Sequence, residues 1–194
     1  MMRNDEGLYN DKLVALIPCY DDKLGNATKL IYEEKEILVG KTVKTVIKNL
    51  CMHYQFDLKA SNNYYSEILT SKSAIPIPIS TALIYVQLKV REPIGKDDGA
   101  MGYFKLNYVD KIYSTNGDTY IRLKNKTEFK LLCSLNTAIK QLKNGELVEK
   151  LHKEVEKDKV KEALVYYQNE DSPAMKSDIA RLFMKIDDIL ERIK

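Results

Sequence analysis

The stretch that decides the fold lies between residues 50 and 80. Its two informative parts read Leu50-Cys51-Met52-His53-Tyr54-Gln55-Phe56-Asp57-Leu58-Lys59-Ala60-Ser61-Asn62-Asn63-Tyr64-Tyr65 and Lys72-Ser73-Ala74-Ile75-Pro76-Ile77-Pro78-Ile79-Ser80. The first part closes a helix and then enters a predicted polar loop, which carries Lys59, Ser61, Asn62 and Asn63. In the second part, Pro76 and Pro78 donate no backbone hydrogen bond and hold φ at about −65°. Residues 75–79 are therefore predicted to form an edge strand or a structured crossover, and neither a helix nor a central strand.

The helix before this stretch is predicted over residues 41–54. Apolar side chains recur there at spacings of four, three and four, which is one face of a helix: Val43, Ile47, Leu50 and Tyr54. Lysines recur on another flank at spacings of three and four: Lys41, Lys44 and Lys48. Since no Asp or Glu lies between residues 41 and 54 to pair with them, this flank is predicted to stay positive. Two interpretations are open, a solvated helix face and a surface that binds phosphates.

The remainder of the first 132 residues is rich in strand patterns. Strands are predicted over 12–20, where Pro18 stops the strand, and over 28–32, 36–39, 82–90, 103–112 and 128–132. The sequence Asn116-Gly117-Asp118 indicates a hairpin turn that joins 109–114 to 119–123. A helix then begins with Ser134 as its N-cap and runs to residue 142. We therefore predict an α+β fold, a strand-rich mixed core with one basic helix, followed by a C-terminal pair of helices.

The composition changes after Gly145. A charged helix is predicted over 147–167, and Ser172-Pro173 is typical of the start of a second helix. The second helix carries an apolar seam at spacings of four, three, four, three and four, formed by Met175, Ile179, Leu182, Ile186, Ile189 and Ile193. This seam fits an antiparallel helical hairpin or a short coiled coil between subunits. We expect a core at 1–145 and a helical hairpin or oligomerisation segment at 146–194.

Composition and charge narrow the classes of protein. The 194 residues are 44% hydrophobic and 30% charged, which is typical of a globular chain. Residues 40–145 hold 16 Lys and Arg against 8 Asp and Glu, so the middle is basic. The chain shows no apolar export signal and no run of 18 apolar residues, which predicts a cytoplasmic protein with no membrane partner. Cys19, Cys51 and Cys133 are expected to be buried and reduced. No catalytic or metal-binding motif was found, so neither an enzyme nor a cofactor is predicted.

The order of these features resembles the ComK-type competence transcription factors. The residues that carry the resemblance are 11–18, 29–34, Leu50-Cys51 with Tyr54, Lys72 with Ile75-Pro76-Ile77, 83–85, Gly102-Tyr103-Phe104, Asn116-Gly117 and Ser134-Leu135. A lesser resemblance, over residues 128–142, is to the end of a LytTR-type DNA-binding domain. The ComK resemblance implies a regulator that binds A/T-rich boxes in duplex DNA, largely through the minor groove, as assemblies of dimers.

These observations predict the partners and the site. Phosphates are expected to be neutralised by Lys41, Lys44, Lys48, Lys59 and Lys72. Contacts to phosphates or to the minor groove are expected from Ser61, Asn62 and Asn63. If the helix flank is only a solvated face, the site would be sought on Lys89, Arg91, Lys105, Arg122, Lys124 and Lys126. The expected partners are double-stranded DNA, further copies of the chain (a dimer or higher homo-oligomer) and a regulatory protein. The alternative is a non-enzymatic protein-interaction adaptor that keeps the fold without binding DNA.

Overall fold

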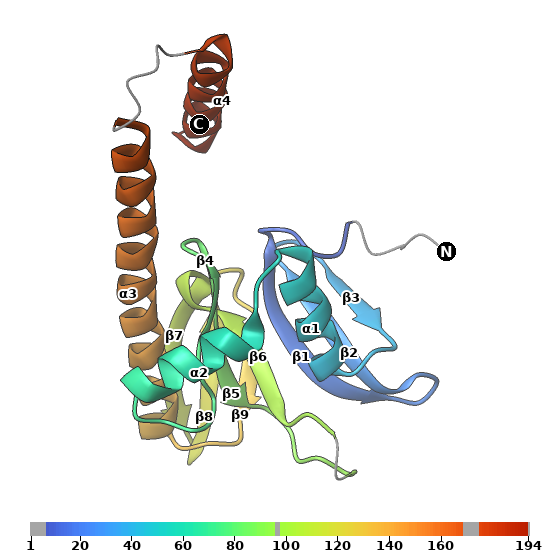
Figure 1. The fold of residues 1–194 in the computed structure, drawn as a ribbon. Coiled ribbons are helices and arrows are strands. Elements are labelled where there is room, and N and C mark those ends of the chain that lie inside the picture. Colours follow the sequence, from blue (N-terminus) through green and yellow to red (C-terminus); the bar gives the residue numbers. More distant parts are fainter. Residues whose placement is uncertain (1–6, 96–97, 169–174, 194) are drawn as a thin grey trace. The chain divides into compact units, whose positions relative to one another are not determined.

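The structure, a computed structural model, describes residues 7–95, 98–168 and 175–193 (Figure 1). Within these ranges the elements are β1 (Leu13–Asp21), β2 (Gly25–Tyr32), β3 (Glu36–Val39), α1 (Val43–His53), α2 (Leu58–Ile68), β4 (Ile77–Ser80), β5 (Leu83–Lys89), β6 (Met101–Lys105), η1 (Leu106–Tyr108), β7 (Val109–Thr115), β8 (Asp118–Leu123), β9 (Glu128–Leu131), α3 (Leu135–Gln168) and α4 (Lys176–Ile193). The chain divides into two compact units, 1–154 and 155–194. The predicted α+β fold is confirmed.

The first unit is built in layers around a six-stranded antiparallel sheet of order β3-β2-β1-β6-β5-β4. One face of this sheet is covered by α1, whose Val46 and Leu50 pack in one cluster with Leu16 and Tyr85. The other face packs against the three-stranded sheet β7-β8-β9 and the start of α3. Its contacts join Val86 and Phe104 to Ile121, Leu123 and Ala138. The helix α1 and the start of α3 therefore cover opposite faces of the six-stranded sheet.

The proline-containing segment is an edge strand, as predicted. β4 is the last strand of the six-stranded sheet and pairs only with β5, with Ile77 opposite Tyr85 and Pro78 opposite Ile84. At an edge, the missing N–H of a proline removes no hydrogen bond to a second neighbour.

The predicted polar loop is wrong, because Leu58–Ile68 is the helix α2. Asp57 caps this helix: its Oδ1 accepts hydrogen bonds from the backbone N–H of Lys59 at 2.9 Å and of Ala60 at 3.0 Å. Gln55, between α1 and α2, adopts φ 54°, and the chain changes direction there (Figure 1). Tyr65 is 4% exposed and marks the face of α2 that packs against the rest of the unit. The polar residues of this segment therefore belong to a largely solvent-facing helix.

Three further predictions need correction. Pro18 does not stop β1, which continues to Asp21, because β6 pairs only with Ala15 and Leu16 and so leaves one side of β1 without a neighbour at Pro18. The predicted strand over 103–112 is interrupted by η1, where the chain passes from the first sheet to the second. All three cysteines are free, but only Cys51 is buried.

The two separate helices predicted over 134–142 and 147–167 are also wrong, since α3 is one helix from Leu135 to Gln168. The backbone N–H of Thr137 donates to Ser134 Oγ at 3.2 Å, which confirms the predicted N-cap. The predicted helix start at Ser172-Pro173 lies outside the described residues, and α4 begins at Lys176. Tyr65, Ile75 and Val148 form a buried cluster, so residues beyond Gly145 contribute to the core of the first unit.

Candidate nucleic-acid interface

The helix α1 directs its predicted basic flank outward. Thr42 caps the helix by accepting a hydrogen bond from Thr45 N at 3.3 Å. The buried positions are Val43, Val46, Ile47, Leu50 and Cys51. Because these residues hold one face against the sheet, Lys44 and Lys48 are exposed on the opposite side. Lys41 lies just before the cap, is half-buried, and its carbonyl accepts a hydrogen bond from Thr28 Oγ1 at 2.7 Å.

The helix α2 and the segment after it add further lysines. Lys59 in the first turn of α2 and Lys72 beyond its end are exposed. Lys48, Lys59 and Lys72 form no ion pair with any residue that the structure describes. Lys41 and Lys44 take part in other interactions within the chain. We call these five lysines together with Asn63 the α1–α2 surface.

The three consecutive polar residues of α2 do not share one environment. Successive residues on a helix point about 100° apart, so Asn63 is exposed while Ser61 and Asn62 are half-buried. Ser61 Oγ and Asn62 Oδ1 are buried and have no hydrogen-bond partner among the described residues. A loop would have allowed all three to reach a ligand, whereas the helix separates them.

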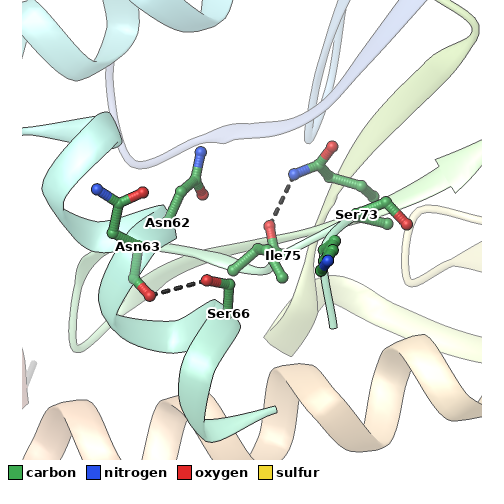
Figure 2. A pocket seen from close by; sticks show the side chains of 8 residues that line it. Asn62, Asn63, Ser66, Ser73 and Ile75 are labelled. Carbon is green, nitrogen blue, oxygen red and sulfur yellow. Dashed lines mark hydrogen bonds between the residues drawn. The ribbon is translucent and has the colours of Figure 1, made fainter. Parts of the chain in front are cut away.

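A polar pocket of about 330 Å³ lies between α2, residues 72–75 and β5. Figure 2 shows Asn62, Asn63 and Ser66 of α2 on one side of it, with Ser73 and Ile75 on the facing segment. Lys72 and Gln87 complete the lining. The structure thus brings together three of the eight predicted site residues, Asn62, Asn63 and Lys72.

Sequence reasoning missed Ser66, Ser73 and Gln87 as pocket residues. The one available signal was Gln87, a polar side chain in the otherwise apolar run of β5 between Val86 and Leu88. Gln87 Nε2 donates to the carbonyl of Ile75 at 2.7 Å and ties the segment after α2 to the sheet. Nothing in the local pattern around residues 66 and 73 distinguishes them from ordinary surface serines.

Most of the alternative basic residues have structural partners. Lys89 pairs with Glu92 at 2.6 Å, Arg122 with Asp110 at 2.7 Å and Lys126 with Asp110 at 3.7 Å.

Two more of these residues, Lys105 and Arg91, donate hydrogen bonds within the fold. Lys105 is 8% exposed, its Nζ donates to the carbonyl of Asp11 at 2.6 Å, and burial lowers its pKa. Arg91 donates from Nε to Gly99 O and from Nη2 to Asn26 Oδ1. Lys124 is the remaining member of the set and is exposed. Five of these six alternative basic residues are therefore already engaged within the fold.

Two kinds of feature are absent from the ranges 7–95, 98–168 and 175–193. None of their helices is both long and apolar enough to cross a membrane. No three His, Cys, Asp or Glu residues gather there in the manner of metal ligands.

The chain was compared with known proteins. A family model described as ComK protein matches residues 8–157, which include the six-stranded sheet, the α1–α2 surface and the polar pocket. No curated protein and no solved structure matches the chain. The resemblance found in the sequence is confirmed, and because the match extends over well more than half of its length, the chain belongs to the ComK family.

Proposed function

We propose that this chain is a transcriptional regulator that prefers A/T-rich duplex DNA and contacts its phosphates and minor groove through the α1–α2 surface. The ComK family is a family of competence transcription factors, which are DNA-binding regulators and not enzymes. The observation that carries the proposal is the set of exposed lysines on and next to the helices α1 and α2: Lys44, Lys48, Lys59 and Lys72. Lys48, Lys59 and Lys72 have no ion-pair partner among the described residues.

The residues of this surface have different roles in the proposal. Lys41, Lys44, Lys48, Lys59 and Lys72 neutralise phosphates, which supplies affinity without sequence preference. Asn63 is exposed, and its amide can read the acceptors of the minor groove. Ser61 and Asn62 contribute less to DNA contacts, because their side-chain oxygens are buried.

The direct test is binding of the full chain to A/T-rich and to mixed-sequence duplexes over a series of salt concentrations. The proposal expects both to be bound at low salt, the A/T-rich duplex more tightly, with affinity falling as salt rises. The alternative is an interaction adaptor that keeps the ComK fold without DNA binding. That alternative is favoured if neither duplex binds even at low salt.

Replacing Asn63 by Ala should narrow the difference in affinity between A/T-rich and mixed duplexes. Since one base-reading contact is worth roughly 1–3 kcal/mol, we expect the preference to fall about fivefold or more. The salt slope should stay nearly unchanged, because no charge is removed. Ser61→Ala is the control and should retain the preference. An Asn63→Ala variant with the parental preference would remove Asn63 from the interface.

For the second unit, we propose self-association through the apolar seam of α4. The described members of this seam are exposed in the isolated chain, from 42% for Ile186 to 70% for Met175. Exposed apolar faces of this kind are typical of helices that bind another helix. A coiled coil between copies of the chain would cover the seam, in keeping with the homo-oligomer expected from the sequence.

Removing residues 158–194 should convert the oligomer into a monomer with weaker DNA binding. The cut lies after residue 157 because an earlier cut at Gly145 would remove Val148, which is buried against Tyr65 and Ile75. Sedimentation measures the oligomeric state. A full-length Leu182→Asp, Ile186→Asp variant should behave like the truncation, while Arg181→Asp should keep the parental state. An unchanged sedimentation coefficient in the double variant would exclude the seam as the interface.

A further inference from the structure

We propose that Ile94, in the loop between β5 and β6, is an apolar wedge that enters the minor groove and bends the duplex. The described residues of this loop are 90–95 and 98–100. Ile94 is 82% exposed, the highest fraction among the exposed large apolar side chains of the described residues. It follows Pro93, which is also exposed and holds φ at about −65°. The inference rests on the proposed binding of duplex DNA and adds how the duplex is deformed.

The loop is held in one conformation by hydrogen bonds from β1 and β2. Asp98 Oδ1 accepts from Asn26 Nδ2 at 2.6 Å. Asp98 Oδ2 accepts from Gly95 N at 2.8 Å and from the hydroxyl of Tyr20. The oxygen of that hydroxyl in turn accepts from Ile94 N at 2.7 Å. Because the backbone on both sides of the turn is fixed before binding, presenting the Ile94 side chain to a partner costs little ordering entropy.

The loop lies on the face of the six-stranded sheet that α1 covers. Asn26 and Thr28 are two residues apart in β2, so their side chains point to the same face. Asn26 holds the loop, whereas Thr28 Oγ1 donates to the carbonyl of Lys41 at 2.7 Å. A Cβ at Gly99 would be 2.5 Å from Val43 Cγ1, in the first turn of α1. The loop and the start of α1 are therefore neighbours, and a duplex bound to the α1–α2 surface can reach the loop.

The charges of the loop do not oppose an approach to DNA. Its two described carboxylates are Glu92 and Asp98, and each has a basic neighbour. Glu92 Oε1 accepts from Lys89 Nζ at 2.6 Å. The hydrogen bond from Tyr20 and the nearby charge of Arg91 lower the pKa of Asp98, so this carboxylate stays ionised and bound to its donors. Both negative charges are offset within the fold, which leaves the lysines of the α1–α2 surface to attract phosphates.

The apolar area of the loop fits DNA better than a partner protein. A stable protein interface buries about 800 Å² on each side, whereas the exposed apolar side chains in the described part of this loop are Pro93 and Ile94. Proteins that deform the minor groove insert single apolar side chains between base steps, isoleucine and proline among them. The step TpA unstacks easily, whereas A-tracts are stiff. A wedge therefore predicts a preference among A/T-rich duplexes for those that contain TpA steps.

The test measures the bend of duplexes of about 25 base pairs by energy transfer between dyes at their two ends. One duplex alternates T and A, and the other has the same base composition arranged in A-tracts. Compared with the free duplex, the full chain should bend the alternating one by roughly 20–90°. It should also bind the alternating duplex about tenfold more tightly than the A-tract duplex.

Ile94→Ala should remove most of this bend and lower the preference for the alternating duplex to about twofold or less. The salt slope should stay the same, because no charge is removed. Ile94→Leu keeps a large apolar side chain and should retain the bend. Ile139→Ala is the matched control, since it shortens another exposed isoleucine, on α3, and it should bend DNA like the parent. Because Ile94 is so exposed, its Ala variant should keep the parental Tm.

Two failures can be told apart. If the duplexes bind but stay unbent, or if Ile94→Ala keeps the bend and the preference, the wedge is overturned while duplex binding stands. The exposed isoleucine would then point to a protein contact. If no duplex binds the parent even at low salt, the proposed function fails and the wedge fails with it.

Discussion

Replacing Lys44 and Lys48 together by Ala should weaken binding to A/T-rich and mixed duplexes by the same factor. Both lysines are exposed on one flank of α1, and contacts to phosphates carry no sequence information. The slope of log affinity against log salt should fall by about two, because each phosphate contact contributes about 0.9 to it. At about 0.1 M salt this corresponds to a loss of about 10- to 100-fold in affinity.

The matched control is the double variant Lys140→Ala, Lys143→Ala. These lysines are also exposed and lie on one helix, α3, three residues apart where Lys44 and Lys48 are four apart. The control should keep the parental affinity and salt slope. If the Lys44, Lys48 variant binds like the parent at every salt concentration, the flank is a solvated helix face. The interface would then have to be sought elsewhere, beginning with the exposed Lys124.

Features fixed by local chemistry could be predicted from the sequence. Pro76 and Pro78 exclude a central strand wherever the chain places them, and β4 is indeed at the sheet edge. The turn at Asn116-Gly117 needs positive φ at both residues, and the structure has 52° and 83° there. The helix α1 could be predicted from the spacing of its apolar residues alone. Each of these features depends on a few neighbouring residues.

Features decided by distant contacts could not be predicted in this way. The helix α2 has a strongly polar sequence, and its inner face depends on Tyr65 meeting Ile75 and Val148. The middle of this segment, Ser61-Asn62-Asn63, consists of residues that favour turns. The Asp57 cap was the one local signal that favoured a helix.

The candidate site shows the same division. Sequence position alone indicated Lys72, Asn62 and Asn63, but the pocket that joins them is also lined by Gln87 of β5, which donates to the carbonyl of Ile75. The positive charge alone also could not distinguish the lysines of the α1–α2 surface from the basic residues that have partners within the fold. Asp110 pairs with both Arg122 and Lys126 only because β7 and β8 are neighbours.

Gly145 is the clearest case in which a local rule and the packing disagree. Glycine in a helix interior is usually a weak point, and replacing it by Ala is worth about 1 kcal/mol in helix propensity. In α3, however, a Cβ at position 145 would lie 2.5 Å from Val86 Cγ1 and 3.2 Å from Leu106 Cδ1. Val86 is fully buried in β5. The glycine therefore permits the close approach of α3 to the sheet.

Gly145→Ala should for this reason destabilise the protein, by a net amount of about 1–2 kcal/mol in urea unfolding. Overpacking of a core costs about 1–3 kcal/mol and outweighs the gain in propensity. Adding Val86→Ala removes the methyl group in conflict, so the double variant should be more stable than the sum of the two single effects predicts. Lys143→Ala, an exposed position in the same turn, should change the free energy of unfolding by less than about 0.5 kcal/mol. A Gly145→Ala variant more stable than the parent would mean that α3 does not pack closely on β5. The support that α3 gives to α2 and its pocket through Val148 would then also be in doubt.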